Sequence, residues 1–137
     1  MNLDLTPQKI YDQFTNNQLD KNSAIEWLTS LIESNNNLEV RVKSIEILGK
    51  IKFLDIKVYK FLEHLLISDS ESLVRGTAAK IIAHNFLNEG LEALKWTLEH
   101  VISPNYATIL INSPQYIYLF STSDLGKVFK YRVKTRL

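Results

Sequence analysis

The chain has 137 residues, of which 45% are hydrophobic and 23% charged, so it can bury one sizeable core. Its formal net charge of +1 gives no overall field that would favour nucleic acid or a strongly acidic partner. The absence of cysteine excludes disulfide bonds, thiol catalysis and cysteine-ligated metal centres. Since no signal segment or membrane-length apolar run is visible, we expect a soluble, cytoplasmic protein that needs no cofactor.

Two helices are predicted before residue 35. Thr6 followed by Pro7 is typical of a helix start, with Thr6 as the N-cap, and this short helix ends near 16–18. Asp20 is the next N-cap candidate. The helix that follows, 21–34, carries a wide apolar stripe that includes Trp27, which we expect to pack in the core.

Four further helices follow from the same helical spacing of apolar residues. In the last two, residues such as Leu73, Val74 and Leu94 are expected to face the core. Gly49 is unfavourable inside a helix, so a close approach of two helices is expected there. The predicted ranges are about 38–51, 55–67 with Asp55 as its cap, 71–84 and 89–102.

An internal repeat connects these helices. Val40-Arg41 returns as Val74-Arg75 after 34 residues, a period typical of arrays of stacked helix pairs. Leucines at 28, 62 and 98 hold equivalent places in the second, fourth and sixth helices. The interpretation is three hairpins of two helices, at about 6–34, 37–67 and 71–102.

The sequence NLEVRVKSIEILGKI (37–51) resembles a helix of a HEAT repeat, and SLVRGTAAKIIA (72–83) is similar. The resemblance covers about residues 6–102. It implies an α-solenoid that binds other proteins and says little about activity. It also implies an aspartate in the turn near the arginine. Asp69 fits that pattern, whereas Asn35 takes its place in the earlier turn.

The last 34 residues differ in composition and charge. Stretches 106–111 and 116–120 are rich in aromatic and β-branched residues, and alternation from Val128 onward is typical of a strand. Alternatively, Ser103-Pro104 and Ser113-Pro114 could each start a helix of a degenerate fourth repeat. The predicted fold is therefore mainly α: about three HEAT-like hairpins in 1–103, with 104–137 capping one end as a β-rich or degenerate helical segment.

No catalytic or metal-binding pattern emerges from the sequence. The three histidines, His64, His84 and His100, lack the spacing of a metal site, and no nucleophile elbow or phosphate loop is present. Arg41 and Arg75 are expected to bond turn carboxylates and nearby carbonyls. The sequence therefore predicts a non-enzymatic scaffold whose partner is another protein.

The candidate partner-binding residues belong to the fourth and sixth helices. Trp96 aligns with positions expected to face outward, and an exposed tryptophan is a typical interface anchor. Packing of Trp96 against the C-terminal segment is an equal alternative. The full candidate set is Trp96, Lys60, Glu63, His64 and His100.

A basic row near the C-terminus offers a second function, binding of nucleic acid or another anionic surface. Residues 104–137 contain five lysines and arginines and one aspartate. A solvated strand face, protected by its charges against edge-to-edge pairing, is the alternative interpretation. The same strand could also pair with its counterpart in a homodimer. The residues of the row are Lys130, Arg132, Lys134 and Arg136.

Overall fold

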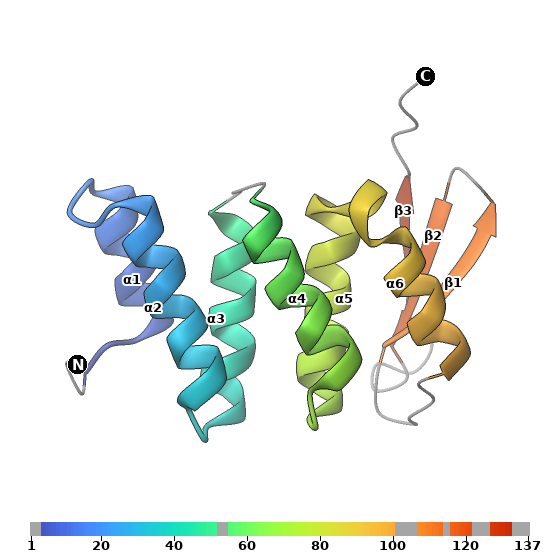
Figure 1. Ribbon diagram of the computed structural model, residues 1–137, viewed down its shortest axis with the longest axis horizontal. Coiled ribbons are helices and arrows are strands. Elements are labelled where there is room, and N and C mark those ends of the chain that lie inside the picture. Colours follow the sequence, from blue (N-terminus) through green and yellow to red (C-terminus); the bar gives the residue numbers. More distant parts are fainter. Residues whose placement is uncertain (1–3, 52–54, 101–106, 114–115, 122–126, 133–137) are drawn as a thin grey trace. The chain divides into compact units, whose positions relative to one another are not determined.

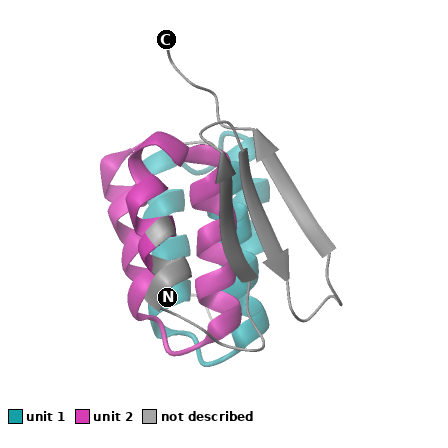
Figure 2. Cartoon of the chain, turned by 90° about the vertical axis from the view of Figure 1, so that its right-hand side faces the viewer, with its two compact units in different colours: residues 1–53 teal, residues 54–137 magenta. Residues whose placement is uncertain are grey.

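The structure, a computed structural model, describes residues 4–51, 55–100, 107–113, 116–121 and 127–132 (Figure 1). The chain forms two compact units, with the boundary between residues 53 and 54, and each is described by itself (Figure 2). The first holds α1, α2 and α3. The second holds α4, α5, α6 and three strands. The predicted division at residue 103 stays a prediction.

The first unit contains α1 (Pro7–Thr15), α2 (Lys21–Ser34) and α3 (Leu38–Lys50), which pack on one another. Two predicted N-caps are confirmed. Thr6 Oγ1 accepts from the Lys9 N–H at 3.2 Å, and Asp20 Oδ1 accepts from the Ser23 N–H at 2.8 Å. The loop between α1 and α2 is turned by Asn17 at φ 59°, a left-handed conformation that asparagine tolerates.

The apolar stripes predicted for these helices are buried or half-buried, with one exposed exception. Trp27, which was predicted to belong to the apolar stripe of α2, is 38% exposed, so the prediction that it packs in the core is wrong. Its neighbour Leu28 has no exposed surface, and one step along a helix turns the side chain by about 100°. The buried apolar residues of this unit include Ile10, Ala24, Leu28, Leu31, Ile32, Ile45, Ile47, Leu48 and Ile51.

The second unit contains α4 (Ile56–Ser68), α5 (Ser72–Asn85) and α6 (Leu87–His100), each in contact with the other two. Asp55 caps α4 as predicted, accepting from the Lys57 N–H at 2.8 Å. Phe86 alone separates α5 from α6, so α6 begins two residues earlier than the sequence indicated. Leu73 is 49% exposed, which corrects its predicted place in the core; Val74 is fully buried.

The helical repeat is visible in two hairpins, α2–α3 and α4–α5, whose turns match residue for residue at a spacing of 34. The Asn37 N–H donates to Asn35 Oδ1 at 2.8 Å, and the Glu71 N–H donates to Asp69 Oδ1 at 2.9 Å. Leu28 and Leu62 are both fully buried at equivalent positions. The predicted hairpin 37–67 would instead join α3 with α4, which belong to different units, so the repeat is offset by one helix.

Three antiparallel strands follow α6: β1 (Ala107–Ser113), β2 (Tyr116–Ser121) and β3 (Lys127–Arg132). They form a sheet of order β1-β2-β3, and β1 lies against α5 and α6. The register of β1 and β2 shifts between Ile111 and Ser113. That the segment 104–137 caps a solenoid stays a prediction.

Among the described residues, no helix has the length and apolar character needed to cross a membrane.

Candidate protein-interaction surface

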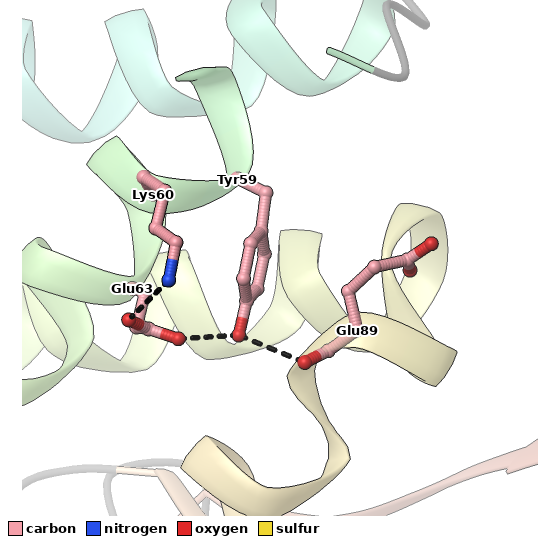
Figure 3. Close-up of polar contacts among 4 residues, drawn as sticks. All are labelled: Tyr59, Lys60, Glu63 and Glu89. Carbon is pink, nitrogen blue, oxygen red and sulfur yellow. Dashed lines mark hydrogen bonds and ion pairs between the residues drawn. The ribbon is translucent and has the colours of Figure 1, made fainter. Parts of the chain in front are cut away.

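Tyr59 connects α4 with α6 by a hydrogen bond and so holds together the two helices that carry the candidate site. Its hydroxyl lies 2.5 Å from Glu63 Oε2 on α4 and 2.9 Å from the Glu89 carbonyl oxygen on α6 (Figure 3). A tyrosine hydroxyl has one proton, so it donates to two acceptors that share that proton. The Tyr59 side chain is almost fully buried, and in this low-dielectric environment each hydrogen bond is electrostatically stronger than in water.

The approach of α6 to α5 and α4 depends on a glycine. A Cβ added at Gly90 would lie 2.2 Å from Ile82 Cγ2 on α5 and 3.4 Å from Tyr59 Cε2 on α4. The Tyr59 ring also packs against Phe86, with centroids 5.7 Å apart. Burial, followed by the hydrogen bond that Tyr59 donates to the Glu63 carboxylate, raises the pKa of Tyr59 well above its usual value. The corresponding close approach predicted at Gly49 stays a prediction.

Two of the predicted site residues, Lys60 and Glu63, come together beside Tyr59. Lys60 Nζ lies 3.7 Å from Glu63 Oε1 and 5.8 Å from the centroid of the Tyr59 ring. Such an exposed ion pair adds little free energy, but it keeps the two charges close to one another on the surface of α4. Glu63 is half-buried, and its second carboxylate oxygen accepts the Tyr59 hydroxyl, so it also has a structural role.

Apolar side chains are exposed on both helices. On α4, Ile56 is 60% and Ile67 38% exposed, and with Lys60 and Glu63 they follow a spacing of four, three and four residues. That spacing places all four on one stripe of the helix. On α6, Trp96 is 41% exposed, whereas Leu94 on the opposite side is fully buried. We call these residues the α4–α6 surface: Ile56, Lys60, Glu63, Ile67 and Trp96.

One of the histidines predicted for the site, His64, borders this surface. His64 is exposed on α4, four residues after Lys60 and three before Ile67, so it lies at the edge of the same stripe. The side chain of His100, the last residue of α6, is outside the described residues. His84 is on α5, where burial and then the charge of Lys80 lower its pKa. In the part of the chain that the structure describes, no group of histidines or carboxylates has the arrangement of a metal site.

Arg41 and Arg75 have the structural role that the sequence predicted. Arg41 Nε donates to the Ile32 carbonyl oxygen at 2.7 Å, and Arg75 Nη1 donates to the Asp69 carbonyl oxygen at 2.6 Å. Both acceptors lie at or near the end of the preceding helix, where carbonyl groups lack helical partners. Each arginine therefore closes the turn of its own hairpin.

The basic row falls partly within the described chain. Lys130 and Arg132 belong to β3, where the register sets them opposite Tyr118 and Tyr116 of β2. Lys134 and Arg136 lie outside the described residues.

Sequence reasoning missed Tyr59, Ile56 and Ile67. Tyr59 lies among apolar residues at helical spacing, so nothing local distinguishes it from an ordinary core aromatic residue. The two isoleucines could have been found, because together with Lys60 and Glu63 they form a stripe that lies off the main apolar face of α4.

Comparison with known proteins bears on this geometry. A family model described as HEAT repeats matches residues 14–83, which is half of the chain and spans both hairpins. None of the curated proteins and none of the solved structures compared with the chain matches it.

Proposed function

The chain belongs to the HEAT-repeat family, and from this premise we propose that it is a non-enzymatic scaffold that binds another protein through its α4–α6 surface. Stacked helical repeats serve in general as rigid platforms for partner proteins. Their outer residues are not needed for the repeat itself. A large apolar side chain at such a position therefore suggests contact with something outside the repeat.

The observation that carries the proposal is the exposure of Trp96. Tryptophan buries more surface than other side chains and is enriched among residues that dominate binding energy. Its helix is held against α4 by Tyr59, so Trp96 and the α4 stripe are presented by helices that are fixed to one another. Lys60, Glu63, His64 and His100 are proposed as polar contacts around it.

Affinity purification from the native host tests the proposal, with Trp27→Ala as the matched control. Trp27 has the same side chain and an exposure of 38%, close to that of Trp96, but it belongs to the first unit. We expect Trp96→Ala to lose the partners that wild type recovers and Trp27→Ala to retain them. Recovery of the same partners by the Trp96→Ala protein would contradict the proposed function.

A second candidate function is binding of an anionic polymer through the basic row. The register favours it, because Lys130 and Arg132 are paired with tyrosines, and basic and aromatic residues together suit single-stranded nucleic acid. Binding to a labelled oligonucleotide should then weaken steeply with salt and should be lost in Lys130→Glu, Arg132→Glu. Absence of binding at low salt would remove this candidate.

A further inference from the structure

We propose that the α4–α6 surface selects a partner segment that is both apolar and basic. An apolar side chain of the segment would cover Trp96 and Ile67, and its lysines or arginines would meet Glu89 and Glu92 on α6. This inference rests on the proposed function and specifies the chemistry of the partner.

Ile67 on α4 and Trp96 on α6 lie at a similar level along their helices. Both helices run in the same direction (Figure 1), and the Tyr59–Glu89 hydrogen bond fixes the level at which they meet. Ile67 lies about 12 Å along α4 from Tyr59, and Trp96 lies about 10 Å along α6 from Glu89, at 1.5 Å per residue. The two exposed apolar side chains therefore lie at a similar height on two helices that are in contact.

Exposed carboxylates lie beside this apolar patch on α6. Glu89 and Glu92 are exposed on α6, within two turns of Trp96, and helix α6 as a whole has three glutamates and one lysine. On α4, the charge of Lys60 is matched by Glu63 at 3.7 Å. Lys57 is two residues before Tyr59 and so lies on the flank of α4 that faces away from α6.

Carboxylates around a tryptophan make the surface selective by charge. A basic segment would gain attraction from them, whereas an acidic segment would bring like charges together as the tryptophan became buried. The apolar contact supplies affinity, and the glutamates decide which apolar segments are accepted.

Selection from a phage-displayed library of random peptides tests the inference directly. The full chain is immobilised, and peptides that also bind the Trp96→Ala protein are removed. We expect the retained peptides to combine an aromatic or aliphatic residue with lysine or arginine. Synthetic copies should bind about tenfold more weakly to Glu89→Lys, Glu92→Lys, a change of about 1.4 kcal/mol.

The matched control is Glu26→Lys, Glu33→Lys, which changes the net charge equally at exposed positions of α2. It should bind the peptides as wild type does. Circular dichroism verifies the fold of each variant, and Glu89→Gln, Glu92→Gln replaces the lysine variant if that one unfolds.

The outcomes separate the inference from the proposed function. Retained peptides that are acidic or uncharged would overturn the inference and leave the proposed function standing. An equal loss of affinity in the α2 control would also overturn it, since it would reveal a general charge effect. A library that yields no peptide dependent on Trp96 overturns it too, while the native-partner experiment decides the proposed function independently.

Discussion

The α2–α3 and α4–α5 hairpins form the same turn with different residues. In the first hairpin the side-chain amide oxygen of Asn35 accepts the backbone N–H of the residue two positions later. In the second hairpin a carboxylate oxygen of Asp69 does the same. Arg41 reaches the carbonyl of Ile32 through Nε, and Arg75 reaches that of Asp69 through Nη1. The repeat therefore preserves a backbone requirement, the satisfaction of groups at a helix end, while the side chains that satisfy it vary.

The outer faces of the two hairpins differ much more. Tyr59 bonds α4 to a third helix, whereas the position 34 residues earlier is Ile25, which has no polar atom on its side chain. The stripe of α4 with its two exposed isoleucines thus lies beside a fixed α6. Internal packing is repeated between the hairpins, but the candidate partner surface belongs to the second one.

The largest effects are expected where the hairpins are alike. Leu28→Ala and Leu62→Ala each remove a fully buried side chain, so each should lower the free energy of unfolding by about 3 kcal/mol. Urea denaturation measures both. Leu73→Ala, at an exposed leucine of α5, is the control and should change stability by less than about 0.5 kcal/mol. Unequal losses for the two buried leucines would break the equivalence of the hairpins.

The next largest effect should come from Gly90, in the unit where three helices meet. Gly90→Ala adds a methyl group that would lie 2.2 Å from Ile82 Cγ2. Such overpacking should lower stability by about 2 kcal/mol, although alanine is the better helix former by about 1 kcal/mol. A double-mutant cycle with Ile82→Ala should show that the combined loss is smaller than the sum. A stabilised Gly90→Ala protein would contradict the close approach.

The two arginines provide a direct comparison of the turns. Arg41→Met and Arg75→Met each leave a carbonyl without its charged donor, so each should lower stability by about 1.5 kcal/mol. Thermal denaturation measures the change. Lys43→Met is the control, because the exposed Lys43–Glu46 pair at 4.0 Å should contribute almost nothing. An arginine variant as stable as the control would show that its turn is closed by other bonds.

Tyr59→Phe tests the hydrogen bond to α6 that distinguishes the α4–α5 hairpin from the α2–α3 hairpin. Loss of the hydroxyl should lower stability by about 1 kcal/mol and should weaken the contact between α4 and α6. Because the pKa of Tyr59 is raised in the folded state, its stabilising contribution is complete below about pH 10, the unfolded value, and is lost as the pH rises further.

Ultraviolet absorbance during alkaline titration of the folded protein measures the ionisation. The chain has six tyrosines, and Tyr59 should ionise only with unfolding. Tyr59→Phe should remove that late step and leave the others unchanged. A titration curve that is the same in the two proteins, apart from its amplitude, would contradict the buried bond.

The smallest effect is expected at His84. Its pKa is lowered in the folded state, so protonation favours unfolding, and stability should decline as the pH falls below about 6.5. His84→Gln should show a shallower decline between pH 7 and pH 5 in urea denaturation. A decline in His84→Gln as steep as that of wild type would contradict the lowered pKa of His84.

Local signals made much of the fold predictable from the sequence. Thr6, Asp20 and Asp55 were identified as N-caps because a cap bonds an N–H within three residues. Trp27 and Leu73 were misplaced because their burial depends on which other helix covers them, and that is not a local property. The site was only partly predictable for a similar reason. Lys60 and Trp96 are visible in the helical pattern, but the Tyr59 bond joins residues 30 positions apart.

The junction at Phe86 has a mechanical consequence. The turns of the two hairpins are three residues long, whereas a single residue, itself buried, connects α5 to α6. A partner that pulls on Trp96 would therefore apply force to α6 without first extending a loop. The force would be transmitted through Phe86 and the Tyr59 hydrogen bond to the core of the second unit, so α6 could detach only if that core were disrupted.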